Sequence, residues 1–236
     1  MVRTRTSIRR DVEALASLEP VFAAVVERHG VPEPRSSNPG AETLLRTIVG
    51  QQVSVAAARS MWAKLEAAFG SPPDLNRLLA ASDEQLRAAG MSRQKSGYIL
   101  SLAELVLSGE LDLDSLPADD EEAIALLTRI KGIGRWSAEI YLLFAEGRRD
   151  VFPAGDLAVL VELGKLLGLA EKPSEKHLRE LAEPWRPYRG AAAVLAWHSY
   201  NSGSQGDEKH EQSNRSLNKR TDRTGCEFRV AVRERE

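Results

Sequence analysis

Apolar residues recur every three or four positions along most of this chain, and no stretch shows the sustained alternation that marks a half-buried β-strand. Leu44, Leu45, Ile48 and Val49, for example, fall on one face of a helix. This spacing predicts an all-α fold. We expect helices at about 11–29 (two segments, divided near Pro20), 41–49, 54–69, 82–90, 92–106, 117–130, from 135 onward, 156–168, 174–184 and 187–200.

Residues that start or stop helices support these boundaries. Ser54 and Ser92 each precede an apolar helical pattern, as N-cap residues do, because a hydroxyl oxygen accepts a hydrogen bond from a free amide of the first turn. Ser82 and Gln85 have the spacing of a capping box. Gly70, followed by two prolines, ends the helix before it.

Composition limits the possible classes of protein without identifying one. The 236 residues suffice for one compact domain or two small lobes, and no apolar run approaches the ~20 residues of a membrane span. The net charge of −2 neither indicates nor excludes a nucleic-acid ligand. A single cysteine, Cys226, excludes an internal disulfide, and no apolar signal core follows the N-terminal arginines, so we expect a protein of the reducing cytoplasm. The four histidines lack metal-ligand spacing, so no metal site is expected.

The segment Lys131-Gly132-Ile133-Gly134 interrupts the pattern between two expected helices. A Gly-x-Gly turn at the N-terminus of a helix exposes amides that can bind a phosphate, at the positive end of the helix dipole. The same glycines can equally form a tight turn between helices and nothing more. These four residues alone leave both interpretations open.

Two longer segments favour the first interpretation. Residues 130–138 (Ile-Lys-Gly-Ile-Gly-Arg-Trp-Ser-Ala) and 151–156 (Val-Phe-Pro-Ala-Gly-Asp) resemble the helix-hairpin-helix superfamily of DNA glycosylases, in particular its 3-methyladenine DNA glycosylase II branch. The likeness covers about residues 40–200, in the same order along the chain. Further matches lie at 48–54, at Gly90-Met91-Ser92 with Lys95 and Tyr98, and at 185–189.

The resemblance implies two helical lobes that flank a DNA-binding cleft, with the hairpin and a catalytic aspartate on its rim. We expect residues 1–40 to form N-terminal helices that pack with the C-terminal lobe, 41–124 to form a central lobe, and 125–200 to carry the hairpin and the catalytic site. Residues 201–236, with small polar residues and mixed charges, are expected to be disordered. Many relatives have an acidic residue where this chain has Gly155.

Asp156 matches the catalytic aspartate of that superfamily, and a carboxylate suits the reaction. Cleavage of an N-glycosidic bond builds positive charge on the deoxyribose, which a nearby carboxylate stabilises while it orients or deprotonates the attacking water. An alkylated purine already carries positive charge, so it leaves without a second, proton-donating carboxyl group. The competing interpretation is that Asp156 only caps the helix that starts at Leu157.

Trp136 occupies the position at which bifunctional members carry a nucleophilic lysine, so the resemblance implies a monofunctional enzyme. An indole can instead stack on an extruded, electron-poor base. Core packing is the alternative, because Trp136 shares a helical face with Ile140 and Leu143. Trp185 and Tyr188 are further candidates for the wall of the substrate pocket.

DNA contacts are expected from polar side chains and from the backbone of the hairpin. Gln52 matches the position whose side chain fills the gap left by the flipped nucleotide, although an exposed turn residue would give the same pattern. Arg189 is expected to meet a phosphate, with a surface salt bridge as the alternative. The remaining candidates belong to the hairpin and to the first turn after it: Lys131, Gly132, Gly134, Arg135 and Ser137.

These features predict a monofunctional DNA glycosylase that hydrolyses the N-glycosidic bond of alkylated purines, of the 3-methyladenine and 7-methylguanine type, in base excision repair. The expected partner is double-stranded DNA with a damaged base, and the expected protein is a monomer without a membrane contact or a cofactor. The resemblance also allows a monovalent cation at the hairpin, held by backbone carbonyls as in relatives. In a bacterium the protein would be associated with the nucleoid.

The alternative from another class is a non-catalytic helix-hairpin-helix module that only binds DNA. Such a module has no need of the loop that ends in Asp156. A glycosylase with lyase activity, or one with an iron–sulfur cluster, would need a lysine at position 136 or four cysteines, and the sequence has neither.

Overall fold

The computed structural model describes residues 5–35 and 37–203, and over these ranges the chain forms helices and loops without a β-strand. The predicted all-α class is confirmed. In chain order the helices are α1 (Arg5–Leu18), α2 (Pro20–His29), α3 (Ala41–Gly50), α4 (Val55–Phe69), α5 (Leu75–Leu79), α6 (Asp83–Ala88), α7 (Arg93–Leu107), α8 (Asp120–Leu127), α9 (Arg135–Phe144), α10 (Leu157–Leu166), α11 (Glu175–Leu181), the 3-10 helix η1 (Glu183–Trp185) and a C-terminal helix over residues 189–203.

The C-terminal helix corrects one boundary. It includes positions 201–203, which the sequence pattern assigned to a disordered tail. The remainder of that expected tail, 204–236, lies outside the described residues. Among the described helices, none is both long and apolar enough to cross a membrane.

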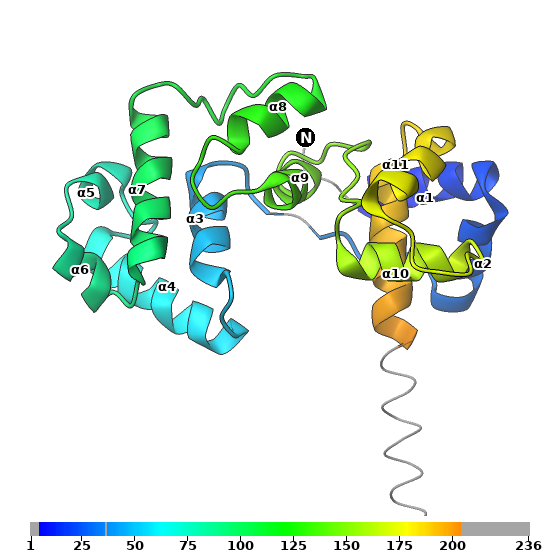
Figure 1. Ribbon diagram of the computed structural model, residues 1–236, viewed down its shortest axis with the longest axis horizontal. Coiled ribbons are helices and arrows are strands. Elements are labelled where there is room, and N and C mark those ends of the chain that lie inside the picture. Colours follow the sequence, from blue (N-terminus) through cyan, green and yellow to red (C-terminus); the bar gives the residue numbers. More distant parts are fainter. Residues whose placement is uncertain (1–4, 36, 204–236) are drawn as a thin grey trace, which may run out of the picture.

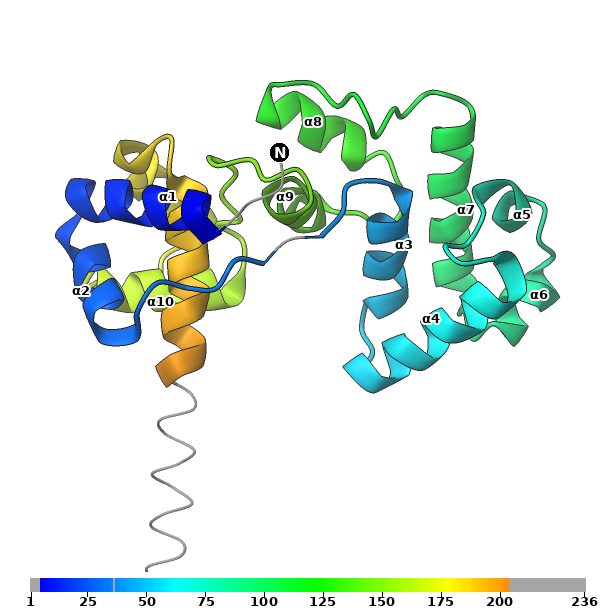
Figure 2. The ribbon, with the colours of Figure 1, turned by 180° about the vertical axis from the view of Figure 1, so that it is seen from behind.

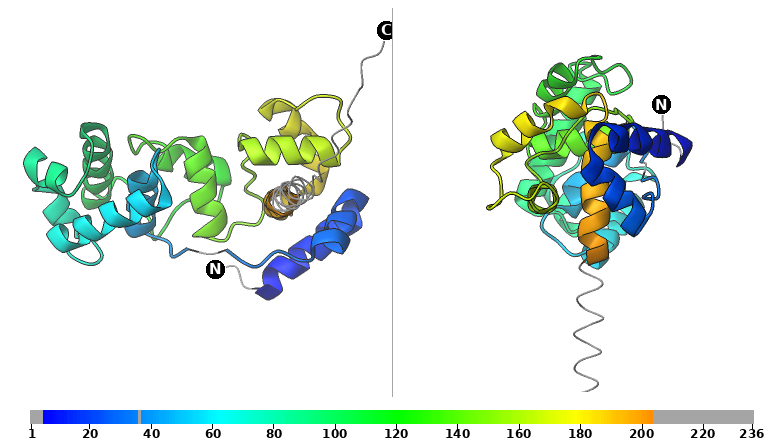
Figure 3. Two further views of the ribbon diagram at one scale, coloured as in Figure 1. Left: turned by 90° about the horizontal axis from the view of Figure 1, so that it is seen from below. Right: turned by 90° about the vertical axis from the view of Figure 1, so that its right-hand side faces the viewer.

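The helices form two groups that lie side by side, with α9 between them (Figure 1). Helices α3 to α9 share a hydrophobic core that includes Leu44 and Ile99, and we call this group lobe 1. Helices α1, α2, α10, α11 and the C-terminal helix share a second core that includes Phe22, Leu163 and Leu195, and we call this group lobe 2. The segment from α2 to α3 crosses between the lobes on the side seen in Figure 2. Within lobe 2, the C-terminal helix lies between α10 and the pair α1–α2 (Figure 3).

The hairpin between α8 and α9 belongs to lobe 1, which corrects the boundary expected at 124/125. Ile130 and Ile133 are buried in the core of lobe 1, and that core extends to Val151. The next residue, Phe152, is buried in the core of lobe 2. The chain therefore changes lobe within the loop that leads to Asp156, and the hairpin and this aspartate come from different lobes.

Local capping determines where most helices of lobe 1 begin. The hydroxyl groups of Ser54 and Ser92 cap α4 and α7, and Ser82 and Gln85 form the predicted capping box at α6. Helix α5, which the periodicity did not predict, is only five residues long and is capped by Asp74. Helix α7 packs against α3, α5 and α6 and is the central helix of this lobe.

Candidate active site

Asp156 caps the N-terminus of α10 and is partly buried. Its Oδ1 accepts hydrogen bonds from the amides of Ala158 at 3.0 Å and Val159 at 3.1 Å. In the loop before it, the Asp156 amide donates to the Pro153 carbonyl at 3.0 Å. Asp156 is therefore the N-cap of α10, which is compatible with a catalytic role as well, because the cap uses only Oδ1 and leaves the second carboxylate oxygen to make other contacts.

Two tryptophans flank this carboxylate. The indole Nε1 of Trp136, on α9, donates to Asp156 Oδ2 at 2.9 Å, and the indole Nε1 of Trp197, on the C-terminal helix, donates to Asp156 Oδ1 at 2.9 Å. Oδ1 therefore has three donors, whereas Oδ2 has one and keeps acceptor capacity for a further group. The side chain of Trp136 is 47% exposed, so its ring is not part of a core. The core interpretation of Trp136 is wrong.

Trp197 is the site residue that the sequence did not reveal. It lies in an apolar, alanine-rich helix, where a tryptophan at helical spacing indicates core packing. The sequence favoured Trp185 instead, but Trp185 is 3% exposed and packs edge-to-face on Phe22 with ring centroids 5.0 Å apart. Trp185 is therefore a core residue of lobe 2, and its assignment to the pocket wall is wrong. Tyr188 is half-buried, and the guanidinium of Arg149 lies 5.1 Å from its ring centroid.

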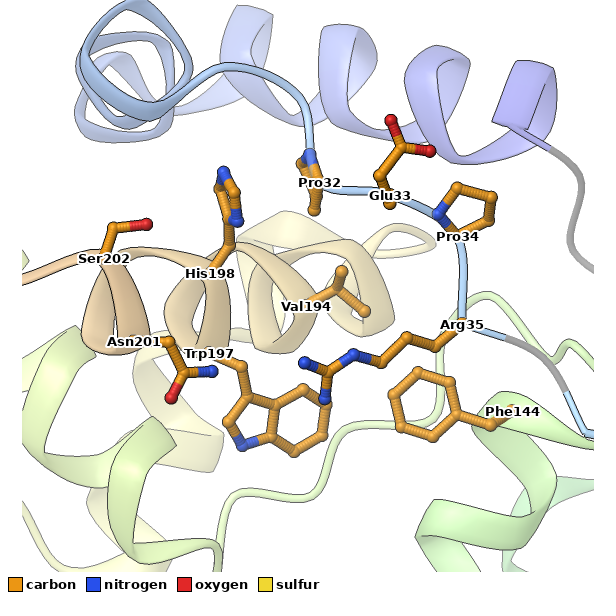
Figure 4. Close-up of a pocket in the computed structure, with 10 residues that line it drawn as sticks. All are labelled: Pro32, Glu33, Pro34, Arg35, Phe144, Val194, Trp197, His198, Asn201 and Ser202. Atoms are coloured by element: carbon orange, nitrogen blue, oxygen red, sulfur yellow. The ribbon is translucent and has the colours of Figure 1, made fainter. Parts of the chain in front are cut away.

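A cavity of about 340 Å³ lies against Trp197. Its walls include Phe144 and Val194, and Figure 4 shows the side chain of Arg35 beside the rings of Trp197 and Phe144. The ring centroids of Trp197 and Phe144 are 5.7 Å apart. The indole nitrogen of Trp197 contacts Asp156, but neither Asp156 nor Trp136 is among the residues that line this cavity.

A second, wider hollow of about 850 Å³ brings together residues from the α3–α4 turn, the start of α7, the hairpin and α9. Gln52, Gly132, Trp136 and Ser137 all line it. Four of the residues predicted from separate parts of the sequence thus face one space. We call this hollow the cleft.

The hairpin presents an uncapped helix N-terminus. Gly132 has φ +81°, a conformation that favours glycine, and a Cβ atom at this position would lie 2.2 Å from the ring of Tyr98. Gly134 is the N-cap of α9 and has no side chain to accept from the first-turn amides. Lys131 is exposed on the same turn. Free amides and the positive end of the helix dipole therefore meet here, as a phosphate requires.

Gln52 lies at the tip of the α3–α4 turn. It is exposed and has φ +54°, which is a left-handed conformation uncommon for a residue with a side chain. The Nε2 of its neighbour Gln51 donates to the carbonyl of Gly132 at 2.8 Å. The turn is therefore linked directly to the hairpin.

The two arginines predicted to contact DNA have carboxylate partners. Arg135 donates to both oxygens of Glu121 and to Glu139 Oε1. Arg189 pairs with Asp150 at 2.8 Å and with Glu183 at 2.9 Å. Its side chain is 11% exposed, so the salt-bridge interpretation of Arg189 is correct and its charge is offset within the protein.

Arg179, on α11, joins the loop before Asp156 to α9. Its guanidinium donates to the Phe152 carbonyl at 3.0 Å and to Glu139 Oε1 at 2.7 Å. Glu139 has only 2% of its side chain exposed. Burial raises the pKa of this carboxyl group, whereas Arg179 and Arg135 act in the opposite direction.

Among the described residues, no group of three or more His, Cys, Asp or Glu side chains is arranged to hold a metal ion. The expected cation at the hairpin would use backbone carbonyls and remains a prediction.

Three features define the structural class: two all-α lobes, an uncapped N-terminus of α9 at the hairpin, and a carboxylate at the start of α10. Over residues 45–187 the chain matches the HhH-GPD superfamily of base excision DNA repair proteins, and it belongs to this family.

Its relatives include the Schizosaccharomyces pombe alkylbase DNA glycosidase-like protein mag2, 29% identical over 80% of this chain and 92% of the relative. DNA-3-methyladenine glycosylase 2 of Escherichia coli is 31% identical over 70% of this chain and 58% of the relative. Among solved structures, a DNA-3-methyladenine glycosidase from Bacillus halodurans has a TM-score of 0.76 at 31% identity, over 83% of this chain and 91% of the other. The S. pombe 3-methyladenine DNA glycosylase Mag1, in complex with abasic DNA, has a TM-score of 0.68 at 28% identity, over 83% and 97%.

Proposed function

We propose that this protein is a monofunctional DNA glycosylase that removes alkylated purines from double-stranded DNA in base excision repair. The observation that carries the proposal is the carboxylate of Asp156, which four N–H donors hold beside the exposed ring of Trp136. The named activities of the related glycosylases support it.

Asp156 acts on the deoxyribose. As the bond between C1′ and the base breaks, its electron pair leaves with the base and positive charge develops on the sugar. Oδ2, which has a single donor, stabilises that charge and accepts a proton from the water that adds to C1′. The fixed donors on Oδ1 keep the carboxylate in place, so little reorganisation accompanies the reaction.

The proposed substrate preference follows from the charge of the leaving group and from the exposed ring of Trp136. A purine made cationic by alkylation leaves without a proton from the protein, so Asp156 alone suffices for such a substrate. Such a base leaves as a neutral molecule. The exposed ring of Trp136, whose indole nitrogen contacts Asp156, can stack on an electron-poor base.

The product is an intact strand with an abasic site. A lyase needs an amine nucleophile at the sugar, and the position that carries it in bifunctional members of the family holds Trp136. We further propose that the protein acts as a monomer, at the DNA of a cytoplasmic nucleoid if the source is bacterial.

Incubation with DNA treated with a methylating agent tests the proposal directly. We expect the release of free 3-methyladenine or 7-methylguanine, identified by chromatography and mass spectrometry, with no strand cleavage before alkali is added. Absence of any released base from wild-type protein would refute the proposed activity. A covalent protein–DNA adduct trapped by borohydride would refute its monofunctional character.

A further inference from the structure

The α3–α4 turn and the hairpin rest on one face of α7. The ammonium group of Lys95 donates to the Val49 carbonyl at 2.6 Å, at the C-terminal end of α3. The ring of Tyr98, one turn later on α7, occupies the space beside Gly132. The hydroxyl of Ser101, after another turn, accepts from the Lys131 amide at 3.2 Å. These residues follow the i, i+3 and i+6 spacing of a single helix stripe.

The contact of Lys95 is buried, which makes it costly to lose. Its side chain is 9% exposed, and burial lowers the pKa of its ammonium group. The charge lies at the C-terminus of α3, where the helix dipole favours a cation. Lys95 therefore fixes the place where α3 ends and the turn begins.

Gln51 closes the link between the two loops. Its Nε2 donates to the carbonyl of Gly132, while its own amide donates to the Ile48 carbonyl at 3.3 Å. The next residue, Gln52, has the left-handed conformation described above and is exposed to the cleft. Gln51 thus anchors the turn on the hairpin, while its exposed neighbour Gln52 lines the cleft.

We propose that Gln51 and the α7 stripe of Lys95, Tyr98 and Ser101 are positioning residues that couple the turn to the hairpin. In this arrangement, phosphate binding at the hairpin amides and insertion of the Gln52 side chain take place as one event. The inference rests on the proposed function, because it assumes that both loops contact damaged DNA. It adds that Gln51 sets the distance between those two contacts without touching the base.

A double-mutant cycle measures this coupling. The probe is a duplex with a tetrahydrofuran abasic analogue, and the variants are Gln52→Ala, Gly134→Ala and the pair. In the wild-type background we expect the combined loss of affinity to differ from the product of the single losses by about fivefold, the contribution of one hydrogen bond. In the Gln51→Ala background, the two losses should multiply.

Two further variants separate coupling from stability. Gln51→Glu keeps the side-chain length but replaces the donor by an acceptor, so it should also abolish the coupling. Asn76→Ala is the matched control, because it removes an exposed carboxamide from α5 of the same lobe; it should leave the coupling intact. Thermal unfolding of each variant shows whether it is folded.

The outcomes are distinguishable. Coupling that is absent in the wild type, or that persists in Gln51→Ala and Gln51→Glu, would refute the inference while leaving the glycosylase proposal in place. Failure of the folded wild-type protein to bind the abasic duplex would refute the proposed function and this inference together.

Discussion

Helices α9 and α10 meet at the site, but only α10 has its N-terminus capped by a side chain. The first turn of α10 is closed by the carboxylate of Asp156, which accepts from two of its amides. The first turn of α9 begins at Gly134, which has no side chain to accept from it. A hydrogen bond from the indole of Trp136 to Asp156 joins the two helices.

The difference shows how one structural element serves two kinds of chemistry. At both N-termini the first-turn amides have no acceptor within the helix, and the positive end of the helix dipole lies there. At α10 these groups hold the protein's own anion in a fixed orientation for reaction. At α9 they stay open and suit an anion from outside, the phosphate of DNA. We therefore assign the chemical step to α10 and strand binding to α9.

Asp156→Asn should give the largest effect. Asparagine is also a good N-cap, so α10 should stay formed while the negative charge is lost. We expect base release to fall at least about 100-fold, the scale of a single electrostatic catalytic group. Affinity for abasic DNA should change little. Near-normal base release by the folded variant would contradict the role of Asp156.

Arg179→Met tests the connection between the two helices. It removes one of the two arginine partners of the buried Glu139 and the donor to the Phe152 carbonyl. We expect a loss of about 2 kcal/mol in unfolding free energy, less than for a buried charge left with no partner, because Arg135 still pairs with Glu139. Arg186→Met is the control, because Arg186 is 52% exposed and its pairs with Asp150 and Glu183 should contribute less than about 1 kcal/mol.

The same variant has a predictable pH dependence. Burial raises the pKa of Glu139 and Arg179 opposes that rise, so without Arg179 the folded state holds a proton on Glu139 to higher pH. A folded state that binds more protons than the unfolded chain loses stability as pH increases. The deficit relative to wild type should therefore be larger at about pH 8 than at about pH 5. Adding Glu139→Gln should reduce it; a pH-independent deficit would argue against this explanation.

Trp136→Ala removes an aromatic surface from the start of α9, together with the indole donor to Asp156 Oδ2, without removing the amides. Excision of alkylated bases should weaken by roughly 1–3 kcal/mol, the contribution of stacking on one base. Binding to abasic DNA, which has no base to stack, should weaken less. Equal losses in the two measurements would mean that Trp136 is structural.

Gly134→Ala should give the smallest effect, confined to binding. A Cβ atom here would have no protein atom within 4 Å, and the φ of −88° is accessible to alanine. The fold should persist while affinity for abasic DNA falls about fivefold, the contribution of one hydrogen bond. Gly132→Ala is the contrasting variant, because its Cβ would lie 2.2 Å from Tyr98 and should destabilise the hairpin itself. Unchanged affinity in Gly134→Ala would make the hairpin purely structural.

The sequence predicted the fold class, most helix starts and the hairpin, because these depend on local periodicity, capping and glycine conformation. It assigned the hairpin to the wrong lobe, since the burial of Ile130 and Ile133 depends on packing against distant helices. Periodicity identifies a buried face but not the partner of that face.

The site could be predicted only in part for a similar reason. Asp156, Trp136 and the hairpin belong to one continuous motif. Trp197 lies 41 positions beyond Asp156, and only the folded chain brings its indole nitrogen to that carboxylate. The pairs Arg135–Glu121 and Arg189–Asp150 are also tertiary contacts, between residues 14 and 39 positions apart.

The central claim is that chemistry at α10 and strand binding at α9 are separate functions. Single-turnover rates on methylated DNA, measured for Asp156→Asn and Gly134→Ala at increasing protein concentration, test it most directly. The account predicts that Gly134→Ala approaches the wild-type rate once the DNA is saturated, whereas Asp156→Asn stays at least about 100-fold slower at every concentration. Recovery of Asp156→Asn at high concentration, or a lasting rate defect in Gly134→Ala, would contradict it.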